Sequence, residues 1–67
     1  MYIGESIEQA RKVLNRTQRS VAEAIGMSLT NYNRIERGHT LPPIGTLQKI
    51  AAELNTTVSG LTKGLDG

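Results

Sequence analysis

The sequence has 67 residues, the length of one small domain, and a chain of that size buries only about 60% of its unfolded surface on folding. It contains no cysteine and one histidine, His39, which excludes a disulfide framework and a thiolate metal site and argues against tetrahedral zinc. The net charge of +2 is uneven, because residues 11–39 hold six basic residues against two acidic ones, a balance of +4. A basic middle between acidic flanks favours a polyanionic partner, although an ordinary surface gives the same asymmetry.

The apolar residues form only short runs, and the chain opens without a charged-then-apolar leader. We therefore expect neither a membrane span nor secretion. These features predict a cytoplasmic protein that requires no metal, no cofactor and no small-molecule ligand.

Apolar residues recur at helical spacing from the start of the chain. The first helix presents one stripe, formed by Ile3, Ile7, Ala10 and Leu14. Thr17 is suited to cap a second helix, which Gly26 ends in a left-handed conformation. The inward residues of that helix are Val21, Ala22 and Ile25. Ser28 is suited to cap a third helix, which ends in the same way at Gly38.

Residues 41–43, Leu-Pro-Pro, form an extended connector because proline disfavours helix in the residue before it. The fourth helix has a stripe formed by Ile44, Leu47, Ile50, Ala51 and Leu54, and Asn55 ends it. Thr57 caps a short fifth helix with two inward residues, Val58 and Leu61. The tail, residues 62–67, is expected to fray. The sequence thus predicts a single all-α domain, residues 1–67, built as a compact five-helix bundle.

The third helix has two faces of different chemistry. Tyr32 and Ile35 sit at core-like spacing. The opposite arc contains no acidic residue and consists of Leu29, Thr30, Asn33, Arg34 and Arg37. Its amide, hydroxyl and guanidinium groups can pair with base edges and phosphates. A polar face without a partner is the alternative. The tight glycine-containing turn before this helix makes residues 17–38 a candidate helix-turn-helix unit, a layout that generic helix corners share.

Glu36 lies nearer the core side of the same helix, where a carboxylate needs a partner. Arg11 lies one position beyond Ala10, close to the inward stripe of the first helix. We therefore predict an Arg11–Glu36 ion pair between the first and third helices. Two separate solvated charges are the alternative.

The stretch TQRSVAEAIGMSLTNYNRIERG, residues 17–38, resembles the helix-turn-helix core of phage-repressor and Cro-like regulators, the XRE family. Direct matches to the pattern of that family are Thr17, Gln18, Ala22, Gly26, Ser28, Ile35, Glu36 and Gly38. Apolar variants stand at its core positions Val21, Ile25, Met27 and Tyr32. The resemblance extends over residues 7–61 and implies a lambda-repressor-like domain that binds double-stranded DNA, commonly as a homodimer on a palindromic operator.

The residue chemistry and the resemblance together assign roles to the site residues. Those expected to read bases in the major groove are Leu29, Thr30, Asn33 and Arg34. Those expected to contact phosphates are Arg16, Gln18, Arg19, Ser28, Asn31, Arg37, His39 and Thr40. Arg34 would prefer guanine and Asn33 adenine. Two alternatives are expected for Leu29. It either presses on a thymine methyl or packs, within the monomer or at an interface. Arg11 and Glu36 match the interhelical ion pair of the family.

The predicted function is a sequence-specific transcriptional regulator, a repressor, which inserts the helix that starts at Ser28 into an operator. The dimer interface is placed at Val58, Leu61 and Leu65, with Met1 and Tyr2 as rivals. Val58 and Leu61 would equally complete the monomer core. A protein-interaction module of the same fold, such as an antitoxin or adaptor, is the alternative function. The protein is not expected to be an enzyme, because His39 and its neighbouring hydroxyls lack a third orienting group.

Overall fold

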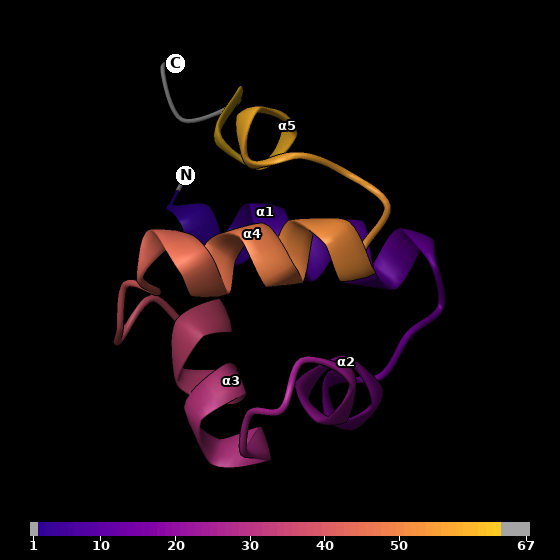
Figure 1. Cartoon of the computed structure of the whole chain (residues 1–67), viewed down its shortest axis with the longest axis vertical. Coiled ribbons are helices and arrows are strands. Elements are labelled where there is room, and N and C mark those ends of the chain that lie inside the picture. Colours follow the sequence, from indigo (N-terminus) through magenta and orange to yellow (C-terminus); the bar gives the residue numbers. More distant parts are fainter. Residues whose placement is uncertain (1, 64–67) are drawn as a thin grey trace.

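A computed structural model describes residues 2–63, all of whose regular structure is helical. The helices are α1 (Ile3–Val13), α2 (Gln18–Ala24), α3 (Leu29–Glu36), α4 (Ile44–Glu53) and α5 (Val58–Thr62). Their main contacts close a ring, in which α1 packs on α3, α3 on α2, α2 on α4, α4 on α5 and α5 on α1. In Figure 1, α2 and α3 lie at one end of the molecule and α5 at the other. The predicted all-α, five-helix class is confirmed.

Side-chain caps fix where three of the helices begin. Hydroxyls accept hydrogen bonds from amides three residues further on: Thr17 from Ser20 at 3.0 Å, Ser28 from Asn31 at 3.2 Å and Thr57 from Gly60 at 3.0 Å. These are the three caps that the sequence predicts. Each satisfies a backbone amide that has no partner inside the helix.

Left-handed residues end four of the helices. Gly26 and Gly38 have φ angles of 76° and 80°, as expected after α2 and α3. Asn15 and Asn55 have φ angles of 56° and 59° and do the same after α1 and α4. Asparagine tolerates this conformation because its short polar side chain hydrogen-bonds locally.

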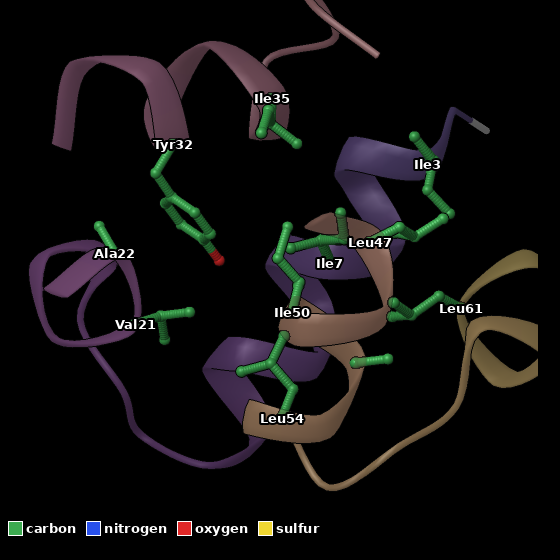
Figure 2. Packing of buried hydrophobic residues seen from close by; sticks show 11 residues of the cluster. Ile3, Ile7, Val21, Ala22, Tyr32, Ile35, Leu47, Ile50, Leu54 and Leu61 are labelled. Atoms are coloured by element: carbon green, nitrogen blue, oxygen red, sulfur yellow. The ribbon is translucent and has the colours of Figure 1, made fainter. Parts of the chain in front are cut away.

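The core lies inside the ring of helices (Figure 2). Its buried apolar residues are Ile3, Ile7, Val21, Ala22, Tyr32, Ile35, Leu47, Ile50, Ala51, Leu54 and Leu61. Tyr32 points from α3 between the side chains of α2 and those of α1 and α4 (Figure 2). It is fully buried and therefore anchors the helix-turn-helix unit to the rest of the domain.

Two expectations about the apolar residues are wrong. Ile44, expected to point inward, is 63% exposed, because α4 begins there and the core covers that helix only from Leu47 onward. Leu61, expected at a dimer interface, is 2% exposed, and Val58 packs against the core beside it. Leu61 and Val58 thus complete the monomer core, which was the other alternative for these two residues. Leu65 and Met1 lie outside the described residues.

The fifth helix includes one residue that was expected to belong to the tail. It runs to Thr62, because the cap at Thr57 starts a full turn that continues through Leu61. The fraying tail was expected to begin at Thr62. Of that tail, residues 64–67 lie outside the described residues.

The crossing of α1 and α3 requires a glycine. Gly4 is buried, and a Cβ atom there would overlap the backbone carbonyl groups of Ile35 and Glu36, lying 2.5 Å from the oxygen of the latter. The missing side chain lets α1 approach the C-terminal end of α3 directly. That approach places Glu36 within reach of α1.

Candidate nucleic-acid interface

The α3 helix divides into a buried side and an open side. Tyr32, Ile35 and Glu36 are buried. The exposed side chains of this helix and its C-cap are those of Thr30, Asn31, Arg34 and Arg37. Leu29 and Asn33 are half-buried at the margin between the two sides. The division follows the helical periodicity in the sequence, and it leaves an outer surface with hydroxyl, amide and guanidinium groups but no carboxylate.

The Arg11–Glu36 ion pair is present and buried. Arg11 Nε donates to Glu36 Oε2 at 2.8 Å, and a second Arg11 nitrogen donates to Glu36 Oε1 at 3.2 Å. The remaining nitrogen of the guanidinium donates to the backbone oxygen of Arg16 at 2.7 Å. The side chains of Arg11 and Glu36 are 10% and 1% exposed. The pair ties α1, the α1–α2 connection and α3 together.

The protonation of this pair follows from its contacts. Burial by itself raises the pKa of Glu36, but hydrogen bonds from Arg11 and Gln18 outweigh it, so that the pKa lies below its ordinary value. The hydrogen bond to Glu36 correspondingly raises the pKa of Arg11. Both groups are therefore charged at neutral pH.

The hydroxyl of Tyr32 is buried near these charges and has no hydrogen-bond partner among the described residues. Burial is the largest cause that raises the pKa of Tyr32 well above its ordinary range, and the neighbouring Glu36 carboxylate adds to it. The phenol is consequently neutral in the folded protein.

Gln18 extends the buried pair toward the open side of α3. Its Nε2 donates to Glu36 Oε1 at 2.9 Å, and its Oε1 accepts from Asn33 Nδ2 at 3.1 Å. This bridge was not predicted from the sequence, from which Gln18 is expected to contact phosphate and Asn33 a base. The signal was available, because Gln18 precedes Val21 and Ala22 by three and four residues and so shares their inward face.

Arg16 also has partners that the sequence analysis did not expect. Its guanidinium lies 2.9 Å from Glu53 Oε2 of α4, and its Nε donates to Ser20 Oγ at 3.0 Å. Both charged side chains are partly exposed, at 29% and 31%. Arg16 was expected to contact phosphate, and in this structure its charge is already paired within the chain.

The other residues expected at phosphates lie on the surface. Exposed are Arg19, Ser28, Asn31, Arg37, His39 and Thr40. Ser28 uses its hydroxyl to cap α3. Arg34, expected to read a base, lies near Thr40, with its Nε 3.4 Å from the hydroxyl oxygen. Among the ion pairs of residues 2–63, none involves Arg19, Arg34 or Arg37. Within residues 2–63, three guanidinium groups therefore have no carboxylate as an ion-pair partner. They belong to Arg19 on α2, Arg34 on α3 and Arg37 at the end of α3.

Leu29 is half-buried at the first position of α3 but does not belong to the core cluster or to the apolar residues packed against it. The monomer therefore covers part of this side chain, and its roles at a thymine methyl or at an interface stay predictions.

Two features of other protein classes, a metal-binding cluster and a membrane-spanning helix, were sought among the described residues. Over residues 2–63, no group of three or more His, Cys, Asp or Glu side chains is placed to hold a metal ion. No helix in the same range has the length and apolarity that crossing a membrane requires.

Three curated proteins are similar to this chain. The cryptic phage CTXphi transcriptional repressor RstR of Vibrio cholerae is 41% identical over 61 residues, which cover 91% of this chain and 54% of that protein. The uncharacterized HTH-type transcriptional regulator YazB of Bacillus subtilis is 36% identical over 87% of this chain and 84% of its own length. The ImmF control region 10 kDa protein of Bacillus phage phi105 is 37% identical over 88% of this chain and 66% of its own length. This chain thus spans about half the length of RstR and about two thirds of the phage phi105 protein.

The profile of the helix-turn-helix family matches residues 7–61, the same span as the resemblance noted in the sequence. The five helices, the capped α2–α3 pair and the buried ion pair that fixes α3 are consistent with that match. The chain belongs to the helix-turn-helix family, among the XRE-type, repressor- and Cro-like proteins.

Proposed function

We propose that this protein is a sequence-specific transcriptional repressor that binds double-stranded DNA by inserting α3 into the major groove. The observation that carries the proposal is an outer surface of α3 that has no carboxylate. A buried ion pair holds this helix in place. Similarity to a phage transcriptional repressor supports the regulatory role.

One group of residues contacts the bases and another contacts the phosphates. Thr30, Asn33 and Arg34 face the bases, where a guanidinium pairs with guanine and an amide with adenine. Arg19 and Arg37, which have no ion-pair partner within residues 2–63, grip the phosphates on either side. Arg16 joins them when a phosphate replaces Glu53 as its partner. Leu29, outside the monomer core, lies where it can press on a thymine methyl.

A homodimer fits this function better than a monomer. The eight residues of α3 span about 12 Å, which is enough for only a few base pairs. The longest dimension of the domain, 30 Å, is shorter than the roughly 34 Å between successive major-groove faces. Two copies on a palindromic operator therefore double the sequence that is recognised. Two strongly exposed apolar side chains follow α3 in the chain, those of Leu41 and Ile44, at 80% and 63% exposure, and we place the dimer contact there.

The test is the selection of bound sequences from a random pool of duplex DNA, followed by titration of the selected site. We expect an inverted repeat with half-sites about one helical turn apart. Replacing Arg34 with Ala should weaken binding to that site by about 5- to 150-fold, the cost of one lost base contact. The matched control is Lys63→Ala, which removes the same charge from an exposed position after α5. Recovery of no consensus, or an Arg34→Ala protein that binds like the control, would refute the proposal.

A further inference from the structure

We infer that Glu36, acting through Gln18, fixes which end of the Asn33 side-chain amide faces the DNA, and so restricts the base there to one with an exocyclic amine. The inference rests on the proposed function and deepens it. It makes Glu36 and Gln18 positioning residues for base recognition, although Glu36 is buried in the protein.

The first step is the chemistry of Glu36. Its carboxylate is almost fully buried and receives three hydrogen bonds, two from Arg11 and one from Gln18. An ionised carboxylate has acceptors and no donor. Any group that hydrogen-bonds to it must therefore present an N–H or O–H.

The second step follows for Gln18. Because the carboxylate only accepts, the nitrogen of the Gln18 amide must face Glu36, as it does at 2.9 Å. The oxygen of the amide then points in the other direction, toward α3. A glutamine free to rotate could present either end, but this one has its polarity set by the charge behind it.

The third step carries the polarity to the surface. The oxygen of Gln18 needs a donor, so Asn33 turns its nitrogen inward, at 3.1 Å. The oxygen of Asn33 consequently points away from Gln18. Reversing the Asn33 amide would bring two carbonyl oxygens together and leave both without a donor. Asn33 is half-buried at the edge of the open side of α3, where its outward oxygen can meet a base.

The consequence for the DNA follows from the groups in the major groove. Adenine and cytosine present an amine that donates to an oxygen, whereas guanine and thymine present acceptors. An outward amide oxygen therefore selects adenine or cytosine. The expectation that asparagine prefers adenine came from the side chain alone, whereas the relay Glu36–Gln18–Asn33 gives the reason for the direction of the preference.

The decisive variant is Glu36→Gln, because it ends the fixed polarity of the relay. Glu36 Oε1 accepts from both Arg11 and Gln18, whereas the new amide also has a nitrogen that can donate to the oxygen of Gln18. Gln18 is then no longer held in one orientation, and Gln18 no longer fixes the orientation of Asn33. The preference for adenine or cytosine at that base should therefore weaken or be lost.

The experiment has two stages. Asn33→Ala first locates the base pair, as the operator position at which preference is lost. Binding of operators with each of the four bases at that position is then measured for the unmodified protein and for Glu36→Gln. We expect the unmodified protein to favour adenine or cytosine by about fivefold or more, and Glu36→Gln to weaken or lose that ratio.

The matched control is Glu53→Gln, the same chemical change in the ion pair between α4 and the α1–α2 connection, which is separate from the relay to Asn33. It should keep the base preference. Gln18→Met removes the relay without a new amide and should also abolish the preference, which decides the matter if Glu36→Gln fails to fold in a thermal melt. The inference is overturned if the unmodified protein favours guanine or thymine at that position, or if the folded variants keep its preference. Failure of the proposed function gives a different result, since no consensus would then be selected.

Discussion

Within residues 2–63, two ion pairs join separate elements of the fold, and water reaches them to different degrees. Arg11 and Glu36 are 10% and 1% exposed, whereas Arg16 and Glu53 are 29% and 31% exposed. A buried pair is costly to break, because the remaining partner keeps its charge away from water. An exposed pair contributes little and is easily exchanged. The buried pair thus sets the geometry of α3, while the exposed pair leaves Arg16 available to a phosphate.

The largest expected effect comes from breaking the buried pair. Replacing Glu36 with Ala removes the buried partner of the Arg11 guanidinium, which keeps only Glu8 at 4.0 Å and the backbone oxygen of Arg16, and should cost about 3–5 kcal/mol of unfolding free energy. A small domain has a total of only about 5–15 kcal/mol, so the variant should be close to unfolding at room temperature. Urea denaturation measures the loss. Glu53→Ala serves as the comparison, and an equal loss in both variants would contradict the distinction between the two pairs.

The close approach that lets the buried pair form should be the next most sensitive feature. Gly4→Ala places a methyl group against the backbone of Ile35 and Glu36 and should cost about 1–3 kcal/mol through overpacking. Gly45→Ala is the control within another helix, because a Cβ atom there meets no atom within 4 Å. It should be neutral or stabilising by up to about 1 kcal/mol. Thermal melts of the two variants should therefore shift in opposite directions or by clearly different amounts.

Acid should weaken the buried pair in a defined pH range. The pKa of Glu36 in the folded protein lies below its ordinary value of 4.5, so the unfolded chain takes up the proton first. The contribution of Glu36 is therefore fully present above that value and is lost as the pH falls from it through the folded pKa. Denaturation at a series of pH values should show the loss. A Glu36→Gln protein should lack this component, and an unchanged acid slope in that variant would count against the ionised pair.

The smallest effect is expected at the exposed pair. Glu53→Gln should change the unfolding free energy by less than about 1 kcal/mol. It releases Arg16 and removes a negative charge, so DNA affinity should rise slightly, most clearly at low salt. Titration at several salt concentrations would detect the change. A fall in affinity would show that Glu53 holds Arg16 in position for the DNA rather than competing with it.

The sequence predicted the helices and three of their caps, because each depends on local spacing. It also predicted the partner of Glu36, because both charges stand near the core-facing stripes of their helices. The spacing of Ile44 gave no sign that the core ends before it, since burial at the end of a helix depends on what packs opposite. The Arg16–Glu53 pair joins segments that only the fold brings together, whereas the inward position of Gln18 follows from its spacing to Val21 and Ala22. Gly4 was equally hidden, because a glycine on an apolar face records a close approach only when the neighbouring helix is known.

The burial of Tyr32 has a practical consequence for following the protein in solution. The chain has two tyrosines and no tryptophan, and the other tyrosine, Tyr2, is 44% exposed. Tyr32 is at 0% exposure inside the core, between the helix-turn-helix unit and the rest of the domain. Its near-ultraviolet absorbance and circular dichroism therefore report whether α3 is docked. In an alkaline spectrophotometric titration, the phenolate of Tyr32 should form only when the domain opens, which gives an optical signal of folding without any label.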